Sequence, residues 1–480
     1  MSHLVQSTIV PILYLLSAVL FIAGLMGMTR IRSARRGNAI GAVAMLLAII
    51  ATLLKLGLVD YRWIIVGVIV GSILGALLAL KVPMTAMPEM VALLNGCGGG
   101  ASALVATSVL WVEVIELGKM GKLSAIQGPE VALTTFLSIL IGGVTFSGSM
   151  VAYLKLQGKI SGQPILLPAR NVVNFLIVGG SVALGLYFAF GANTPHALAL
   201  LCIVLLGVSL VLGVLLVIPI GGADMPVVIS LLNSYSGLAA AMTGFVLGNS
   251  LLIISGALVG ASGIILSKIM CDAMNRTLGN VLFGGFGTQA PSAGKGGEYT
   301  NVRSYTAEDA ALVLEAAESV VIVPGYGLAV AQAQHTAEEL AELLEKRGCK
   351  VTYGIHPVAG RMPGHMNVLL AEANVPYEKL LEMDTVNSEF KNTDVVLVVG
   401  ANDVVNPAAE TTPGSPIYGM PVLQVWNAQT VMVIKRSLSP GFAGIKNDLF
   451  ENDNTMMIFG DAKKVLHDLV TEVKSLSPAA

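Results

Sequence analysis

The sequence predicts a polytopic α-helical membrane bundle of about nine spans, followed by a cytoplasmic α/β domain with a parallel sheet. The 480 residues are 54% hydrophobic and 12% charged, with a mean hydropathy of +0.77, whereas soluble proteins carry about 25% charged residues. The charge is also uneven, because residues 1–280 hold 14 Lys+Arg and 7 Asp+Glu, and residues 281–480 hold 14 and 23. The first part is therefore expected to face lipid and the second to face water.

Apolar segments of about 18–24 residues, the length that crosses a bilayer as a helix, recur through the first part. We expect them at residues 9–28, 39–57, 63–80, 88–111, 131–154, 172–190, 197–218, 226–248 and 251–270. The eighth and ninth segments are almost contiguous, which predicts a tight helical hairpin. The fourth contains the glycine-rich run 95–100, which is unfavourable for an isolated helix.

Basic residues predict how the bundle lies in the membrane. With the N-terminus outside, ten Lys/Arg of the loops fall on the inner side and four on the outer side, in agreement with the positive-inside rule. We therefore expect a transmembrane domain at 1–280, a linker at 281–305 and a cytoplasmic domain at 306–480. Small residues spaced by four predict helix–helix contacts in two spans. They are Gly67, Gly71 and Gly75 in the third span, and Gly256 and Gly260 in the ninth.

Several classes of function are disfavoured by composition. The four cysteines are far apart with no CxxC spacing, so we expect neither a metal site nor a disulfide. The soluble part is acidic and would repel phosphate backbones, so we expect no nucleic-acid partner. The first apolar run lacks a small-residue cleavage site and is predicted to stay as a helix.

Short apolar strands alternate with helices after the linker, a pattern typical of a parallel sheet covered by helices. Thr306 and Asp309 form a capping box that predicts a helix start. We expect strands at 320–323, 350–354, 394–399, 422–426, 431–434 and 456–459, and helices at 329–346 and 462–474.

The strongest motif is a buried strand that runs into Gly325-Tyr326-Gly327 and then opens a helix. Glycines at such a turn let the backbone approach a pyrophosphate, which the helix N-terminus stabilises. Val330 stands where the dinucleotide fingerprint has its third glycine, and an ordinary glycine turn would give the same pattern.

The second strand distinguishes between nucleotides. An NAD site normally places Asp or Glu there to bind the ribose 2′-hydroxyl, but residues 353–357 contain no acid. The chain continues into a glycine loop with Arg361, and Lys435-Arg436-Ser437 at a later strand end offers cations to a 2′-phosphate. These features favour NADP over NAD, although a solvated strand end would also be basic.

Other polar residues have both functional and structural interpretations. Asp403 follows the strand 394–399 in a ligand-binding position, or it is a turn residue. Asn95 and Asn233 interrupt apolar spans, where polar groups are costly, and interhelical hydrogen bonds would also explain them. Asp224 precedes the eighth span and could be its N-cap.

Together these features resemble the β subunit of proton-translocating NAD(P) transhydrogenase over nearly the whole chain. The matching motifs are Met87-Pro88-Glu89, the runs 222–226 and 232–237, Pro324-Gly325-Tyr326-Gly327, the run 354–364 with His356-Pro357-Val358-Ala359-Gly360-Arg361-Met362-Pro363-Gly364, Gly400-Ala401-Asn402-Asp403, and Lys435-Arg436-Ser437. The resemblance implies hydride transfer between NADH and NADP⁺, coupled to inward proton movement.

The resemblance also implies a site and partners. It places NADP(H) on a Rossmann-like C-terminal domain, and NAD(H) on a partner α subunit of one or two chains. The working enzyme would be a dimer of such heteromers in a bacterial inner membrane. The cofactor-binding positions implied are Gly325, Tyr326, Gly327, Val358, Ala359, Gly360, Arg361, Met362, Pro363, Gly400, Ala401, Asn402, Asp403, Val404, Gly419, Met420, Lys435, Arg436, Ser437, Leu438, Ser439, Pro440, Gly441, Phe442, Asp461 and Ala462.

Four residues are expected to take part in turnover: Asp403, Asp224, Asn233 and Asn95. Many members of the family carry histidine at the position of Asn95, and an amide does not titrate. The proton is therefore expected on a partner helix or on a water wire past Asn95 and Asn233.

Two other classes of function are compatible with the pattern. One is a transporter or channel with a redox-sensing cytoplasmic nucleotide domain, and the other is a membrane-anchored NADP dehydrogenase with its own substrate. A neighbouring reading frame for an NAD-binding chain would separate them from a transhydrogenase.

Overall fold

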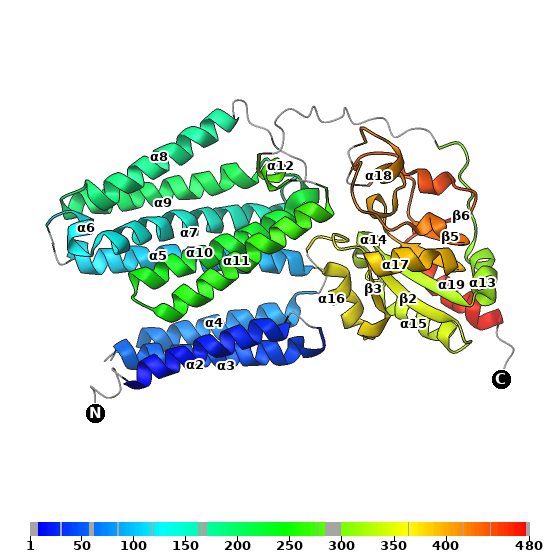
Figure 1. The fold of residues 1–480 in the computed structure, drawn as a ribbon, viewed down its shortest axis with the longest axis horizontal. Coiled ribbons are helices and arrows are strands. Elements are labelled where there is room, and N and C mark those ends of the chain that lie inside the picture. Colours follow the sequence, from blue (N-terminus) through cyan, green and yellow to red (C-terminus); the bar gives the residue numbers. More distant parts are fainter. Residues whose placement is uncertain are drawn as a thin grey trace. The chain divides into compact units, whose positions relative to one another are not determined.

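The computed structural model describes residues 8–28, 31–56, 62–83, 86–116, 118, 120–161, 165, 170–275, 277–283, 299–362, 364–415, 417–441 and 443–476. Contacts divide the chain into two compact units. The first comprises Met1–Pro83, Glu89–Gly222 and Val228–Leu266, and the second Met84–Pro88, Ala223–Val227 and Ser267–Ala480. Figure 1 labels many of the helices and strands of each unit.

The first unit is a bundle of long apolar helices. Within the described residues, nine helices are long and apolar enough to cross a membrane, and the nine predicted spans are confirmed. They are α2 (Val10–Met28), α3 (Ile31–Leu56), α4 (Arg62–Lys81), α5 (Met87–Leu110), α7 (Pro129–Leu156), α8 (Arg170–Phe190), α9 (Pro195–Val217), α10 (Met225–Val246) and α11 (Ser250–Ala273). The predicted hairpin of the last two is also present. Short elements not predicted are η3 (Trp111–Glu116), α6 (Leu123–Ile126) and η4 (Gly222–Asp224), and, in the second unit, α12 (Leu278–Phe283).

The glycine-rich run inside α5 is helical because three of its glycines, Gly96, Gly99 and Gly100, pack against α7. A Cβ on Gly99 would lie 2.6 Å from Thr145 Cβ and 2.9 Å from the Gly142 carbonyl oxygen. A larger side chain would therefore separate the two helices. The poor helix propensity of glycine is offset by this close packing.

Helices α10 and α11 are in backbone contact. A Cβ on Gly237 would lie 2.6 Å from Gly260 N and 2.8 Å from the Gly256 oxygen. Ser230 and Ser234 of α10 donate hydrogen bonds to the carbonyls of Gly263 and Gly260, at 3.2 and 2.6 Å. The expected contact through Gly256 and Gly260 is confirmed.

The expected contact through the glycines of α4 is wrong within this chain. An added Cβ on Gly67, Gly71 or Gly75 would meet no atom within 4 Å among the described residues. The helix has no buried residue at all. Spacing alone therefore could not tell which small-residue face has a neighbour in the same chain.

The second unit is built on a six-stranded, all-parallel sheet. The strands are β1 (Ser319–Pro324), β2 (Lys350–Ile355), β3 (Leu380–Glu382), β4 (Val395–Val399), β5 (Thr430–Lys435) and β6 (Thr455–Phe459). Their order is β3-β2-β1-β4-β5-β6, so the sheet is extended in opposite directions from β1 and β4. This is the doubly wound arrangement, in which ligands bind where the strand order reverses.

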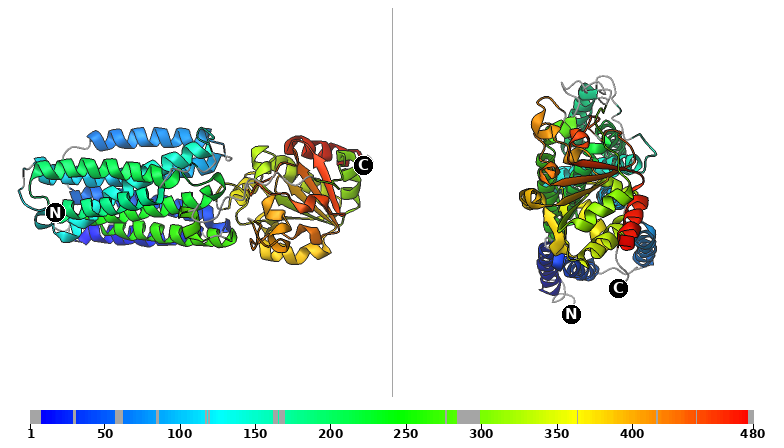
Figure 2. Two further views of the ribbon diagram at one scale, coloured as in Figure 1. Left: turned by 90° about the horizontal axis from the view of Figure 1, so that it is seen from above. Right: turned by 90° about the vertical axis from the view of Figure 1, so that its right-hand side faces the viewer.

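Helices cover both faces of this sheet (Figure 2). Alternate strand residues such as Val320 and Ile322 form one core with α13 (Ala307–Ala316), α15 (Gln334–Glu345), α16 (His365–Glu372) and α19 (Ala462–Leu476). Val321 and Val323 point to the other core, with residues of α17 (Met383–Glu389), η6 (Phe390–Asn392), η8 (Val425–Asn427) and η9 (Asp448–Glu451). The capping box predicted for Thr306 and Asp309 is present at the start of α13.

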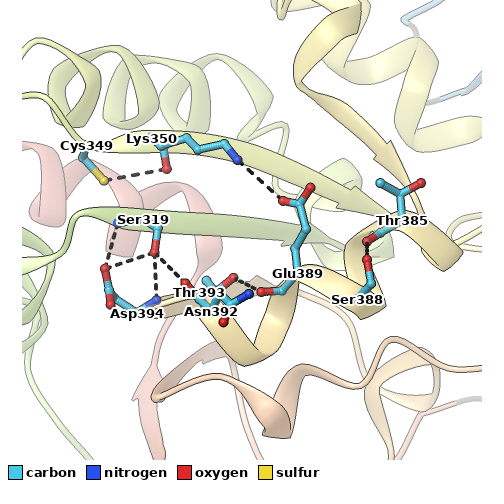
Figure 3. A network of polar contacts seen from close by, with 9 residues as sticks. All are labelled: Ser319, Cys349, Lys350, Thr385, Ser388, Glu389, Asn392, Thr393 and Asp394. Atoms are coloured by element: carbon cyan, nitrogen blue, oxygen red, sulfur yellow. Dashed lines mark hydrogen bonds and ion pairs between the residues drawn. The ribbon is translucent and has the colours of Figure 1, made fainter.

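A polar cluster fixes the register of β1 against β4 at their amino ends (Figure 3). Asp394 Oδ2 accepts hydrogen bonds from Glu318 N, Ser319 N and Ser319 Oγ, at 3.0, 2.9 and 3.0 Å. The Asp394 N–H donates back to Ser319 Oγ at 3.0 Å. Because this cluster lies at the amino ends of the strands, it aligns the sheet and leaves the carboxyl ends for ligands.

Two predicted elements differ from the structure, and one short strand was not predicted. The helix expected at 329–346 is two helices, α14 (Tyr326–Val330) and α15, because Gln332 has a φ of 50° that ends the first. The strand expected at 422–426 is wrong, since the Leu423 N–H bonds to the Val404 carbonyl and Val425 begins the 3-10 turn η8. The short β3 was not predicted, because its three residues carry no alternation.

The linker expected at 281–305 is described at its two ends. Residues 281–283 close α12, residues 284–298 lie outside the described residues, and residues 299–305 lead into α13. We call residues 299–305 the entry segment. It pairs with β6, since Tyr305 N donates to Met457 O at 2.8 Å and Met457 N to Arg303 O at 3.0 Å. The domain boundaries predicted from sequence stay a prediction.

The α10–α11 contact predicts a strong effect of one methyl group. Gly237→Ala should destabilise the bundle by about 1–3 kcal/mol, because the new Cβ meets backbone that cannot move aside. Thermal unfolding in detergent micelles measures this. Gly207→Ala in α9 is the control, since its added Cβ would meet nothing described within 4 Å. Equal stability of the two variants would contradict the close packing.

Candidate functional site

A cavity of about 440 Å³ opens at the carboxyl ends of β1, β4, β5 and β6. Its position at the β1–β4 reversal is the one that doubly wound sheets use for ligands. Lining residues come from the loops after five strands. They are Gly325, Tyr326, Gly327, Val330, Ala331, Val358, Ala359, Gly360, Gly400, Ala401, Asn402, Asp403, Val404, Ile434, Lys435, Arg436, Ser437, Ser439, Pro440, Gly441, Gly460, Asp461 and Ala462.

The floor of the cavity is a contact between two glycine loops. A Cβ on Gly325 would overlap Ala401, and one on Gly327 would lie 2.6 Å from Gly400 Cα. Gly400 itself has a φ of +66°, a backbone angle that residues other than glycine rarely adopt. These glycines are needed because the loops after β1 and β4 touch through their backbones.

The glycine turn differs from the expected phosphate cradle in one respect. Gly325 N donates to Val399 O, Gly327 N to Gly400 O and Leu328 N to Gly325 O, at 2.9, 2.9 and 3.1 Å. These N–H groups are therefore used inside the protein. The following helix, α14, has only five residues. The helix that opens here is therefore shorter than expected, and stabilisation of a pyrophosphate by its N-terminus stays a prediction.

Two buried histidines hold the loop that follows β2. His356 Nε2 donates to the Pro421 carbonyl at 2.8 Å, which leaves Nδ1 to accept from Val358 N at 3.2 Å. His365 Nδ1 accepts from Arg361 N at 3.0 Å. Burial lowers the pKa of each ring to about 4, and the Arg361 charge adds to the effect at His365. Both rings are therefore neutral at physiological pH, and their hydrogen bonds fix the shape of this loop.

The same loop is joined to the β1 turn by a cation–π contact. The Arg361 guanidinium lies 4.4 Å from the centroid of the Tyr326 ring. Gly360, the residue before Arg361, has a φ of +109°. A Cβ at Gly360 would overlap the His365 ring. Arg361 therefore shapes the loop, and it does not line the cavity.

Lys435 is the best-placed cation of the cavity. Its Nζ donates to the Ser439 carbonyl and lies 5.1 Å from the centroid of the Phe450 ring. Burial lowers the pKa of Lys435 to about 8, and the Asp403 carboxylate opposes that shift. Keeping Lys435 charged therefore costs free energy, and an anionic ligand would raise its pKa toward the ordinary value of a lysine.

The neighbouring groups suit an anion. Arg436 is exposed beside the cavity and makes no hydrogen bond or ion pair within the described part of the chain. Ser437 Oγ and Ser439 Oγ lie 2.9 Å apart on the same loop. Two cations and two hydroxyls at one strand end form a donor set typical of phosphate binding.

The acidic residues of the cavity are used in local structure. Asp403 Oδ2 accepts from Ala443 N at 3.0 Å, which ties the loop after β4 to the loop after β5. Asp461 Oδ1 accepts from Lys463 N and Lys464 N at 3.1 and 3.4 Å and so caps α19. Asn402 is held by Asn447, whose Nδ2 donates to the Asn402 carbonyl at 3.0 Å.

Most of the cofactor positions expected from sequence line the cavity, and some do not. Arg361, Met362, Gly419, Met420 and Leu438 lie outside the lining, and Pro363 and Phe442 lie outside the described residues. Met420 instead packs in a small core with Ile417 and Val422. Sequence reasoning missed Val330, Ala331, Ile434 and Gly460, all of which directly adjoin a motif or a strand end.

The polar residues expected to act in the membrane lie on α5 and α10. Asn95 is buried and its Nδ2 donates to the Ile229 carbonyl of α10 at 3.2 Å. Asn233 is four residues after Ile229, on the same face of α10. Asp224 ends the turn η4, directly before α10.

A buried polar seam continues between α5, α7 and α10. Ser138 Oγ and Thr243 Oγ1 are 2.7 Å apart, and Ser138 donates to the Ser102 carbonyl at 3.2 Å. These side chains are satisfied inside the bundle, as polar groups in an apolar environment must be.

The family of this chain follows from comparison of its sequence with known proteins. The family described as NAD(P) transhydrogenase beta subunit matches residues 10–472. The chain belongs to this family. A protein named NAD(P) transhydrogenase subunit beta from Rhodospirillum rubrum is 50% identical over 460 residues, covering 95% of this chain and 97% of that protein. A protein of the same name from a designated strain of that species matches equally well.

Membership of the family confirms the resemblance found in the motifs. The chain is a subunit of an enzyme, an NAD(P) transhydrogenase. Nine apolar helices among the described residues make it an integral membrane protein. The family's designation as a beta subunit implies an alpha partner.

The site predicts an unusual titration of Lys435. Its pKa should lie near 8 and should fall further in Asp403→Asn, because the variant removes the negative charge that favours the ammonium form. NMR of ¹³C-methylated lysines follows the titration, with Lys435→Arg used to assign the resonance. An unchanged or higher pKa in Asp403→Asn would contradict the proximity of the two charges.

Proposed function

We propose that this chain is the NADP(H)-binding, proton-conducting subunit of a proton-translocating transhydrogenase. Hydride passes between NADH on the alpha partner and NADP⁺ in the cavity, coupled to proton movement across the membrane. The observation that carries the proposal is the cavity at the β1–β4 reversal, with Lys435, Arg436 and Ser437 at its edge. The bound nicotinamide supplies the hydride chemistry.

The donor set fits NADP(H) in two ways. Lys435, Arg436, Ser437 and Ser439 offer cations and hydroxyls to a phosphate, and a half-buried lysine with a lowered pKa gains most from such a ligand. Gly400 and Gly441 also let the loops of the cavity pack closely against their neighbours, since a Cβ on either glycine would overlap neighbouring atoms.

The 2′-phosphate is favoured over a free ribose hydroxyl. β2 ends at Ile355 and is followed by His356 and Pro357, so no carboxylate stands where an NAD site has one. His356 is already committed to Pro421 and Val358. NAD(H) is accordingly assigned to the partner.

The remaining cofactor positions are proposed as shaping residues of the same site. Arg361, Met362 and Leu438 belong to loops that also supply lining residues. Gly419, Met420, Pro363 and Phe442 are proposed from the motif resemblance alone. Asp403 is proposed to act in turnover by holding Ala443 beside the nucleotide, through the hydrogen bond that the Ala443 N–H donates to its carboxylate.

The proton path is proposed to follow the polar seam of the bundle. Asn95 and Asn233 would order water in it, and Asp224 would couple it to the nucleotide state. The N-terminus is assigned to the outside and the nucleotide domain to the cytoplasm of a bacterium, on the positive-inside count. A dimer of heteromers, with an alpha subunit of one or two chains, completes the assembly.

The direct test uses vesicles that contain the chain and its alpha partner. NADH should reduce an NADP⁺ analogue while a trapped pH dye reports proton movement, and an uncoupler should abolish the dye signal. A redox-sensing transporter would move protons without hydride transfer. A membrane-anchored dehydrogenase with its own substrate would neither pass hydride from NADH to the analogue nor move protons. Either result would contradict the proposal.

Replacement of the cations should change nucleotide specificity. Lys435→Ala or Arg436→Ala should each cost roughly 1.5–3 kcal/mol of NADP(H) binding, which is roughly tenfold to a hundredfold in affinity. Arg436→Ala should lose at least as much, because guanidinium grips phosphate with two hydrogen bonds. Calorimetry with NADP⁺ and NAD⁺ distinguishes the outcomes. An equal loss for both nucleotides would show a solvated strand end instead.

Asp224→Asn separates a coupling residue from a helix cap. Asn and Asp cap helices about equally well, so a pure cap should tolerate the change in both stability and turnover. We expect proton pumping and NADP(H)-linked turnover to fall while the thermal stability stays near wild type. Near wild-type pumping in the vesicle assay would reduce Asp224 to a cap.

A further inference from the structure

The turn formed by residues 446–451 contacts both the proposed nucleotide cavity and the entry segment. On the cavity side, Asn447 Nδ2 donates to the carbonyl of Asn402, which lines the cavity. On the other side, the Asn447 N–H donates to the Tyr299 hydroxyl oxygen at 3.1 Å. Asn447 is fully buried, so one side chain and its own backbone bridge the two segments.

A second route runs through the adjacent residues Phe450 and Glu451. The Phe450 ring lies under Lys435 and stacks on Tyr299, with ring centroids 6.1 Å apart. Glu451 Oε1 accepts from Thr300 N at 2.5 Å and from Asn301 N at 3.3 Å. A cation of the cavity and the backbone of the entry segment are therefore joined through two consecutive residues.

The carboxylate end of this route is held by Lys446. Lys446 Nζ forms an ion pair with Glu451 Oε2 and lies 5.0 Å from the Tyr299 ring centroid. The Lys446 hydrogen bond, followed by the one from Thr300, lowers the pKa of Glu451 to about 2. Glu451 is thus charged at any physiological pH, and its hydrogen bonds to the entry segment do not depend on proton uptake.

We propose that the 446–451 turn is a positioning element that transmits nucleotide occupancy from the cavity to the entry segment. The inference rests on the proposed NADP(H) site. A phosphate on Lys435 changes the cation's contacts with Phe450 and Ser439. Displacement of Asn402 by the same ligand changes the hydrogen bond between the Asn402 carbonyl and Asn447. Both changes reach residues 299–301, where the chain enters the nucleotide domain.

The neighbouring pair Arg303–Asp453 provides a matched control. Arg303 Nη2 and Asp453 Oδ1 are 2.7 Å apart and tie the same entry segment to the residues just after the turn. Within the described residues, neither side chain forms a hydrogen bond or ion pair with Asn402, Lys435 or Phe450. Loss of this ion pair should therefore loosen the segment locally without altering its response to the ligand.

The experiment is amide hydrogen exchange of the full-length chain in detergent micelles, with and without saturating NADP⁺. In the wild type, NADP⁺ should change the exchange of the Thr300 and Asn301 amides by about tenfold, while NAD⁺ should not. Tyr299→Phe removes only the hydroxyl, and Glu451→Gln removes only the charge. Both should lose the response while keeping NADP⁺ affinity within about threefold of wild type. Asp453→Asn should keep the response.

The outcomes separate this inference from the proposed function. Calorimetry on the same samples shows whether NADP⁺ binds. Binding without any change at residues 299–301 in the wild type overturns the coupling role alone. An unaltered response in both Tyr299→Phe and Glu451→Gln overturns it as well. Failure of the wild type to bind NADP⁺ overturns the proposed function, and this inference with it.

Discussion

The backbone contact between the loops after β1 and β4 is the constraint on which the nucleotide domain depends. Gly325 and Gly327 lie directly against Gly400 and Ala401, and their N–H groups bond to β4 and its loop. Any side chain at these positions would separate the two halves of the sheet where its order reverses. The cavity exists because the halves diverge just beyond this contact, so the glycines build the site through packing more than through donated hydrogen bonds.

Once that contact is made, the other loops are tied down by neutral or acidic groups, and the cations are left to the cavity. His356 and His365 hold the loop after β2 as uncharged rings. Asp403 holds the loop after β5 through Ala443. Lys435 keeps a desolvated charge near this carboxylate. An anionic ligand would stabilise the charged form of Lys435, because it replaces the solvation that the ammonium group lost on burial.

Sequence reasoning succeeded where one local pattern determines the structure. Apolar length located the nine spans, and a glycine motif after a strand located the floor of the cavity. It failed where distant residues decide. The run 422–426 has strand-like composition, yet the Leu423 N–H is taken by Val404. Ile434 and Gly460 line the cavity only because β5 and β6 end beside β4. Asn447 carries no recognisable motif, and its importance follows from its two partners, Asn402 and Tyr299.

The bundle places a physical limit on how this chain can move a proton. Asn95, Ser102, Ser138 and Thr243 are buried between α5, α7 and α10, and their amides and hydroxyls do not titrate at neutral pH. Their hydrogen bonds to neighbouring carbonyls and hydroxyls leave them suited to ordering water. In the proposed function, the proton therefore crosses this seam on water or on groups that another chain supplies. Groups from another chain would come from the alpha partner that the family's designation as a beta subunit implies.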